Sequence, residues 1–209
     1  ASATDNGDGG KVVLWSDVSN ADSVTQANGS IKAEAGPNGG NGGQIETSGH
    51  VLNVDGIQVS TQAPQGSTGQ WLLDPYNVYI MKDTPTSSAT LSAGTYTPSS
   101  AASYIQSSDL NAALGSSNVT VTTGGTSPGT SAGNLYVYDG LNYGNYKLTL
   151  NAWNNIYFYF PVNVTAGGSL ALEYGQKAVT PPSAGSNGVN TSSYFVDAPI
   201  NLPTGPNFS

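Results

Sequence analysis

Asn134-Leu-Tyr-Val-Tyr138 is repeated twenty-one positions later as Asn155-Ile-Tyr-Phe-Tyr159, with every residue matched in type. The same offset carries Leu141-Asn-Tyr143 onto Val162-Asn-Val164. Each segment alternates in the way that a β-strand with one buried face alternates. Two neighbouring stretches of the chain therefore share one pattern of short strands.

The repeated unit contains a third segment, because Leu148-Thr-Leu150 is matched by Leu170-Ala-Leu172 at an offset of twenty-two. Part of a further copy follows, where Pro199–Gly205 matches Pro161–Gly167 at an offset of thirty-eight. The longer spacing contains a run of proline, glycine and serine, Thr180–Gly188. We interpret this run as a loop inserted into one turn.

Three short strands that recur about every twenty residues are typical of a solenoid whose coils stack on one another. We predict an all-β fold, a right-handed parallel β-helix with roughly 20–22 residues per coil and one short helical insertion. Equivalent residues of successive coils should lie about 4.8 Å apart. An ordinary β-sandwich is the alternative. The expected core contacts are Leu135 with Ile156, Val137 with Phe158 and Leu148 with Leu170.

The composition agrees with an all-β chain and excludes some functions. Charged residues make up only 9% of the 209 residues, and there are 27 glycines, which argues against a helical bundle. The chain has no arginine and a formal net charge of −8. Because nucleic acids and anionic lipids require a basic surface, we expect neither as a partner.

The absence of cysteine leaves the cellular compartment open. No run of apolar residues is long enough to span a membrane, so we predict that the chain does not cross one. The repeat pattern is interrupted at both ends of the sequence. We therefore expect this sequence to be a fragment of a longer protein.

The chain divides into three predicted regions. Residues 1–82 hold β-helix coils, residues 83–117 form an insertion with a short helix, and residues 118–209 continue the coils, with a loop insertion near residues 175–192. The helix is predicted because Ile105, Leu110 and Leu114 recur at helical spacing. Ser99 or Ser100 is the expected N-cap, and Gly115 is the expected stop.

Three motifs in the first region carry a family resemblance. They are Gly7–Asp17 (GDGGKVVLWSD), Gly42–Gly56 (GGQIETSGHVLNVDG) and Gly69–Ile80 (GQWLLDPYNVYI). In this order they resemble the filamentous haemagglutinin-like and high-molecular-weight adhesins of Gram-negative two-partner secretion systems. The resemblance is close over about residues 7–80, and later segments such as Lys147–Ile156 look like the repeats that follow in that family.

The resemblance implies a large secreted β-helical exoprotein that a partner transporter carries across the outer membrane and that is displayed at the cell surface or released. Members of the family mostly attach cells to host tissue, to other cells or to extracellular polysaccharide, and some acquire haem carriers. The resemblance supplies no catalytic motif. The tyrosine-rich outward positions between residues 136 and 159 depart from the Thr, Ser and Asn expected there.

A polysaccharide lyase or hydrolase is the enzyme that a β-helix suggests, and the residues for it are scarce. Asp139 and Glu173 are the carboxylate candidates, but acids at strand ends more often cap turns. His50 lies in a Ser-Gly-His turn, where a lone histidine is expected at the surface or in the turn. We predict no catalytic residues, no metal site and no cofactor.

Four asparagines each precede an apolar, alternating segment. We expect their side-chain amides to bond the backbone of their own coil or of the next one. Glycan attachment is the alternative, since four asparagines fit the N-x-[ST] pattern. The first set is Asn77, Asn118, Asn134 and Asn155, and the second is Asn28, Asn118, Asn163 and Asn190.

The candidate binding residues are Tyr136, Tyr138, Tyr157 and Tyr159. If the apolar residues between them face inward, these four phenols share one outward face, where they could contact a glycan or a cell-surface receptor. Alternatively, another segment covers this face, or the tyrosines only stabilise the stacking. The main functional hypothesis is a surface adhesin segment, whose parent chain uses an outer-membrane two-partner transporter. The alternative is a structural stalk without binding.

Overall fold

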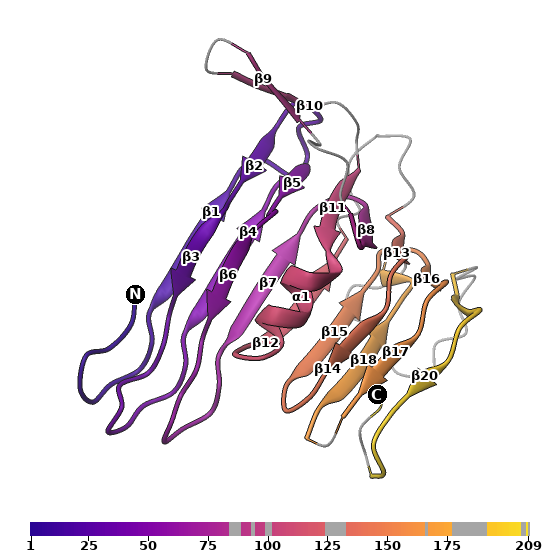
Figure 1. Ribbon diagram of the computed structural model, residues 1–209. Helices are drawn as coiled ribbons and strands as arrows, with labels where there is room; N and C mark the ends of the chain where they lie inside the picture. Colours follow the sequence, from indigo (N-terminus) through magenta and orange to yellow (C-terminus); the bar gives the residue numbers. More distant parts are fainter. Residues whose placement is uncertain are drawn as a thin grey trace.

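The structure is a computed structural model that describes residues 1–83, 89–92, 95–98, 102–123, 133–165, 167–176, 192–205 and 208. Its two long sheets are entirely parallel. Each sheet forms one wall of the solenoid, because successive coils contribute neighbouring strands (Figure 1). The predicted parallel β-helix is therefore confirmed, and the β-sandwich is not the fold. The predicted loop at Thr180–Gly188 lies outside the described residues, as do Ser99, Ser100 and Asn190.

The first wall is a six-stranded parallel sheet whose spatial order follows the chain. Each strand begins with an outward polar or small residue and alternates from there. The strands are β1 (Lys11–Trp15), β4 (Gln44–Ser48), β7 (Gln70–Asp74), β12 (Asn118–Thr122), β15 (Lys147–Asn151) and β18 (Ser169–Glu173).

The second wall is a seven-stranded parallel sheet, and it carries the aromatic residues considered below. Four of its seven strands have an aliphatic or aromatic residue at both the first and the third position, and these positions are in register from strand to strand. In spatial order the seven strands are β2 (Val24–Gln26), β5 (Val51–Asn53), β11 (Ser103–Gln106), β8 (Val78–Met81), β13 (Leu135–Val137), β16 (Ile156–Phe158) and β19 (Tyr194–Val196).

The third wall consists of two short sheets with the helix α1 (Ser107–Ala113) between them. The helix contacts β6 on one side and β14 on the other. The Gly56 N–H donates to Asp109 Oδ2 at 2.7 Å, and the Asn142 N–H donates to Asn111 Oδ1 at 3.0 Å. The strands are β3 (Gly29–Lys32), β6 (Ile57–Ser60), β14 (Leu141–Tyr143), β17 (Val162–Val164) and β20 (Ile200–Asn201).

The predicted short helix is present, and it replaces a strand in one coil. Leu110 and Leu114 are fully buried, as their helical spacing indicated. The N-cap residue is Gln106, not Ser99 or Ser100. Ile105, which we had placed in the helix, belongs to strand β11. The helix is shorter than predicted because residues 103–106 pair with the second wall.

The insertion contains more strand structure than the sequence indicated. An antiparallel hairpin is formed by β9 (Ala89–Ser92) and β10 (Thr95–Pro98). It projects beyond the strand ends near β2, at the top of Figure 1. Strand β11 then returns to the second wall and lies between β5 and β8, although β8 precedes it in the chain. The order of strands in space is therefore locally reversed.

The predicted register of the repeats is confirmed in all three walls, and in the first wall Leu148 pairs with Leu170 as expected. Leu135 pairs with Ile156 and Val137 with Phe158, one coil apart. The partial third copy is also in register, since Val162 pairs with Ile200.

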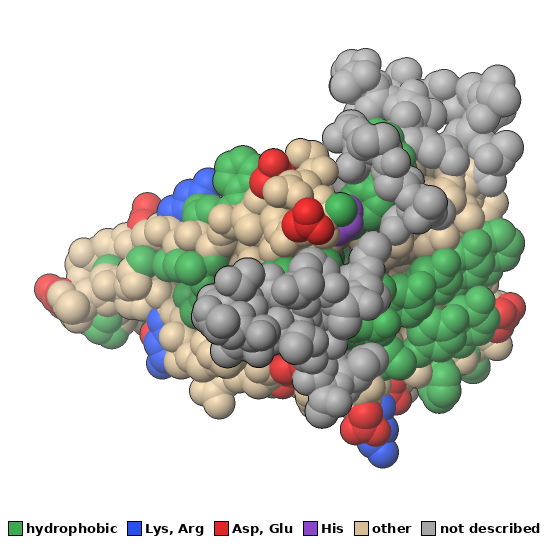
Figure 2. Space-filling view, turned by 90° about the horizontal axis from the view of Figure 1, so that it is seen from above, with side chains coloured by type: hydrophobic (Ala, Val, Ile, Leu, Met, Phe, Trp, Pro, Cys, Tyr) green, Lys and Arg blue, Asp and Glu red, His purple; other side chains and the backbone are tan. Residues whose placement is uncertain are grey.

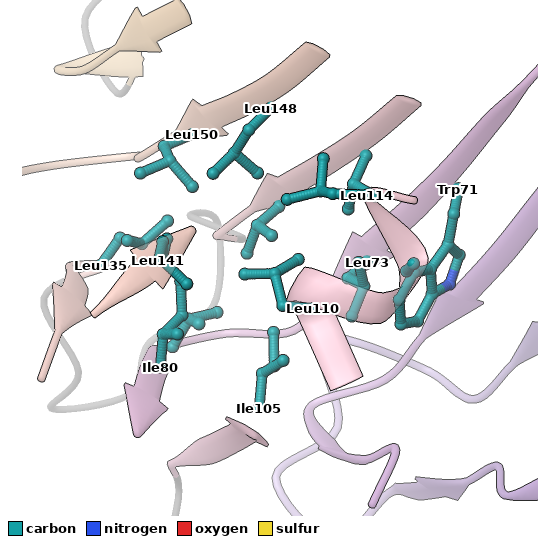
Figure 3. Close-up of a cluster of buried hydrophobic side chains, with 14 of the residues drawn as sticks. Trp71, Leu73, Ile80, Ile105, Leu110, Leu114, Leu135, Leu141, Leu148 and Leu150 are labelled. Atoms are coloured by element: carbon teal, nitrogen blue, oxygen red, sulfur yellow. The ribbon is translucent and has the colours of Figure 1, made fainter. Parts of the chain in front are cut away.

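The core is a column of aliphatic side chains enclosed by the three walls. Figure 3 shows Leu148 and Leu150 of β15 facing Leu135 and Leu141, with the helix residues Leu110 and Leu114 filling the coil below. All six side chains are completely buried. At the N-terminal end, the Trp71 indole packs into the same core, and its Nε1–H donates to Thr47 Oγ1 at 3.1 Å.

One corner of the coils requires glycine because successive backbones approach closely there. A Cβ atom on Gly43 would lie 2.0 Å from the Gly10 carbonyl oxygen, and one on Gly69 would lie 1.9 Å from the Gly43 carbonyl oxygen. These contacts are far inside van der Waals distance. The glycines that open the three N-terminal motifs therefore set how closely the coils stack.

We predict that Leu148→Asp destabilises the fold by about 4 kcal/mol, because it places an unpaired charge in the core. Leu148 is completely buried between Val119 and Leu170 of the adjacent strands. The measurement is urea unfolding followed by circular dichroism. The neighbouring outward change Thr149→Asp is the control and should cost less than about 1 kcal/mol. Equal effects of the two changes would contradict the assignment of inside and outside.

Candidate functional site: an aromatic face on the second wall

The four tyrosines selected from the sequence lie together on the outward face of β13 and β16. Tyr136 and Tyr157 stack with ring centroids 5.0 Å apart, and Tyr138 and Tyr159 stack at 4.8 Å. The angle between the ring planes is 10° in both pairs. The structure therefore confirms that the four tyrosines are stacked in pairs, as predicted.

The inner row of this ladder is longer than predicted. Tyr79 stacks on Tyr136 at 4.7 Å, Tyr104 follows at 5.5 Å from Tyr79, and Phe195 stacks on Tyr157 at 4.8 Å. We call the five rings Tyr104, Tyr79, Tyr136, Tyr157 and Phe195 the aromatic column. One signal for the extension was present in the sequence, because Asn77-Val-Tyr79 has the same Asn-apolar-Tyr order as the two repeats. Tyr104 and Phe195 do not follow an asparagine and an apolar residue in this way.

Stacking determines which part of each ring is available to a ligand. Within the column, rings from Tyr79 to Phe195 are tilted by 16° or less from their neighbours. Ring faces therefore cover one another, and ring edges and hydroxyl groups point outward. A sugar that binds here would meet ring edges and hydroxyls, not open ring faces.

The outer row holds the most exposed tyrosines of the ladder, and Phe195 at the end of the aromatic column is 44% exposed. Tyr138 is 37% exposed and Tyr159 is 39% exposed, and Phe160 beside them is 44% exposed. Tyr136 and Tyr157 are half-buried. The helix lies in the third wall and leaves these residues exposed. Hydrophobic side chains form parallel rows on one side of the molecule (Figure 2).

Asparagine side chains hold the tyrosines of the column from the turn before each strand. Asn134 Nδ2 donates to the Tyr136 hydroxyl at 2.9 Å, and Asn155 Nδ2 donates to the Tyr157 hydroxyl at 2.9 Å. The asparagine and the tyrosine are two residues apart and lie on the same side of the strand. Each repeat thus fixes the position of its own phenol.

The other side of each amide links one coil to the next. Asn77 Oδ1 accepts the Asn134 N–H at 3.1 Å, Asn134 Oδ1 accepts the Asn155 N–H at 3.1 Å, and Asn155 Oδ1 accepts the Ser193 N–H at 2.8 Å. In the first wall, Asn118 Oδ1 likewise accepts the Lys147 N–H at 2.9 Å. The predicted structural role of the four asparagines is confirmed.

Asn142, Asn163 and Asn201 form a separate ladder on the third wall. Asn163 Nδ2 donates to Asn142 Oδ1 at 2.8 Å, and Asn201 Nδ2 donates to Asn163 Oδ1 at 2.7 Å. A glycan on Asn163 would occupy the Nδ2 atom that makes the first of these bonds. Of the other N-x-[ST] asparagines, Asn28 is exposed and Asn118 is half-buried.

The surroundings raise the pKa of two phenols on this face, Tyr79 and Tyr159. Burial, followed by the nearby tyrosine hydroxyls, raises the pKa of Tyr79. The pKa of Tyr159 is also raised, by desolvation first and then by the charges of Tyr138 and Asp197 and a side-chain hydrogen bond with Tyr138. The hydroxyls of Tyr79 and Tyr159 are therefore neutral at physiological pH.

His50 lies in the turn between β4 and β5, as one of the two expectations had it, but it is buried and not at the surface. Its side chain is 3% exposed, and its ring stacks on the Tyr76 ring at 4.8 Å. Its Nδ1 atom lies 3.0 Å from the Val18 carbonyl oxygen. The turn folds inward because this ring packs against Tyr76, in the corresponding turn of the next coil.

The two carboxylates considered for catalysis both make structural hydrogen bonds. Asp139 Oδ2 accepts the Ser107 hydroxyl at the start of the helix. Glu173 Oε2 accepts Asn151 Nδ2 of the adjacent strand at 2.6 Å. In the part of the chain that the structure describes, no three His, Cys, Asp or Glu side chains gather as metal ligands would. No helix there has the length and hydropathy of a membrane span.

One carboxyl group elsewhere has a strongly shifted pKa. Asp74 is half-buried on the outward face of β7, and its pKa is raised from 3.8 to about 6, mainly by burial and also by repulsion from Glu46. Because the folded state binds this proton more tightly than the unfolded state does, the free energy of unfolding falls as the pH rises through this window. At neutral pH the Asp74 charge is destabilising.

We therefore predict that Asp74→Asn stabilises the protein by up to about 3 kcal/mol at neutral pH, the upper figure that the size of the pKa shift gives. The gain should disappear below pH 3.8, where Asp74 is protonated in both states. Urea unfolding at several pH values measures this, with the exposed change Asp22→Asn as the control. Destabilisation at neutral pH by Asp74→Asn would show that a favourable interaction of the charge outweighs its burial.

Asn134→Ala should cost about 1–3 kcal/mol, because it removes the acceptor of the Asn155 N–H and the donor to the Tyr136 hydroxyl. Asn142→Ala in the exposed third-wall ladder is the matched control, and we expect it to cost less than about 1 kcal/mol. Thermal and urea unfolding of both variants give the comparison. If Asn134→Ala were as mild as the control, the amides would not bind the coils together.

Comparison of the sequence with protein-family models and with curated proteins gives no match. Membership of the haemagglutinin-like adhesins therefore remains a prediction from the three N-terminal motifs. The roles of the aromatic column and the asparagines are derived from their geometry in this chain. That geometry is the basis of the function proposed next.

Proposed function

We propose that this chain is a segment of a secreted or surface-displayed bacterial adhesin, and that its aromatic face contacts a glycan on host cells, on other bacteria or in extracellular polysaccharide. The family resemblance of residues 7–80 supports the secreted class and the two-partner transporter. The aromatic face supports a binding role for this segment itself.

The observation that carries the proposal is the exposure of Tyr138, Tyr159 and Phe160 at 37%, 39% and 44%. Strands β13 and β16 lie inside the second wall and not at its edge, so this exposure is not caused by a missing neighbouring strand. Exposed clusters of large apolar side chains usually mark a contact surface. Here the cluster belongs to a chain whose other outward strand positions are mostly polar.

A glycan suits this surface better than an apolar partner does. The hydroxyls of Tyr138 and Tyr159 are able to donate to and accept from sugar hydroxyls, and the ring edges provide apolar contact. The face runs along the coil axis, so it presents repeated contacts at the coil spacing. An extended polysaccharide matches such a periodic surface.

A structural stalk is the second candidate, and it also rests on a specific observation. The amides of Asn134 and Asn155 hold the inner tyrosines, and the rings cover one another's faces. An aromatic column held in this way would stiffen the solenoid without binding anything. In that case, this segment would only present a distant binding domain.

The test is glycan binding by the isolated chain, first on a glycan array and then by calorimetry with the glycans that bind. We expect Tyr138→Ser combined with Tyr159→Ser to weaken binding by roughly 1–3 kcal/mol while leaving the fold intact. The control is Gln44→Ser with Gln70→Ser on the first wall, which should bind as the unmodified chain does. Absence of binding by the unmodified chain at high concentration would favour the stalk and exclude the adhesive role of this segment.

A further inference from the structure

Among the ring contacts of the described residues, Tyr138 and Tyr159 are the closely stacked pair of phenols in which both rings are more than a third exposed. Their rings are nearly parallel at 4.8 Å, and they come from equivalent positions of successive coils. Tyr174 and Tyr194 are about as exposed, but their rings meet edge to face, 5.3 Å apart at 75°. The other closely stacked tyrosines, those of the aromatic column, are half-buried.

We propose that Tyr138 and Tyr159 are a site of oxidative cross-linking, where a haem peroxidase with hydrogen peroxide joins the two rings in a dityrosine bond that staples successive coils. The proposal does not depend on glycan binding. It uses the proximity of the two phenols and their access to an external oxidant.

The chemistry requires two one-electron oxidations. Each phenol loses one electron and one proton, which gives two phenoxyl radicals. A carbon–carbon bond forms between the carbons next to the hydroxyl-bearing carbons, and the hydrogens on these two carbons leave as protons while both hydroxyls are restored. The two electrons and two protons removed overall reduce one hydrogen peroxide to two waters.

Geometry favours this pair over the column. The reacting carbons must approach from the stacking distance to bonding distance, so at least one ring must turn toward the other. Exposed side chains rotate on the picosecond to nanosecond timescale, which the outer pair allows. Tyr136 and Tyr157 are equally close to each other, but Asn134 and Asn155 hold their hydroxyls.

The bond would have a structural consequence for a chain that contains no cysteine. It would connect the end of β13 to the end of β16, and so link two coils covalently where a disulfide is impossible. Like a disulfide, such a link lowers the conformational entropy of the unfolded chain. Coil stacking would then be reinforced in an oxidising environment.

The experiment treats the purified chain with a haem peroxidase and hydrogen peroxide, isolates the monomer and maps cross-linked peptides by mass spectrometry. We expect one principal product, which lacks the mass of two hydrogen atoms and links the peptides of Tyr138 and Tyr159. Tyr138→Phe and Tyr159→Phe should each abolish this product, whereas the matched control Tyr136→Phe should retain it. These changes remove only a hydroxyl group and keep the ring.

A second measurement separates the fold from the reactivity of the two residues. In urea, where the coils are unfolded, the Tyr138–Tyr159 product should be lost although both phenols are fully accessible. The proposal is overturned if the folded chain gives no intramolecular product, if the product joins other tyrosines, or if the same product forms equally in urea.

Discussion

Parallel pairing of each coil with the next, in register, is the constraint on which the rest of the structure depends. Once the backbone N–H and C=O groups of one coil bond to those of the following coil, every side chain has its equivalent about 4.8 Å away. Like residues then stack on like. A position can hold only a residue that tolerates a copy or a near copy of itself as its neighbour.

Each part of the molecule satisfies this constraint with different chemistry. Apolar residues do so in the core, where Leu148 lies between Val119 and Leu170. Asparagines do so at the turns, because one amide is able to donate within its coil and accept from the next. Glycines do so at the corner where there is no room for Cβ atoms. Aromatic rings do so on the outer face, where stacking converts a row of tyrosines into one continuous surface.

The constraint also explains what the sequence predicts well. The offset between the two repeats predicts the pairing of β13 with β16, the ladder of four tyrosines and the structural role of the asparagines, because all of these are direct consequences of the register. It does not predict the position of β11, since periodicity reveals that a strand exists but not where it inserts. Burial of His50 was missed for a related reason. The ring that covers it, Tyr76, comes from the following coil, so no local sequence pattern marks the contact.

The candidate site, like the fold, is only partly predictable from the sequence. The sequence identifies the exposed phenols, but the inner column extends to Tyr104 and Phe195, which no repeat marks. The availability of ring edges instead of ring faces depends on side-chain angles, which no pattern of residue types encodes. Function is therefore less predictable here than fold, because the same tyrosines serve both stacking and contact.

The register is tested most directly across β12 and β15, where the chain between the strands interrupts the repeat. Thr120 pairs with Thr149 in adjacent strands, and both side chains face outward. The native chain has no cysteine, so an engineered pair gives an unambiguous reading. Thr120→Cys with Thr149→Cys should form a disulfide rapidly under mild oxidation, because the Cα atoms are within bridging distance. Thr120→Cys with Asn151→Cys, displaced by two residues on the same face, should not. Equal or reversed rates would contradict the in-register stacking of coils.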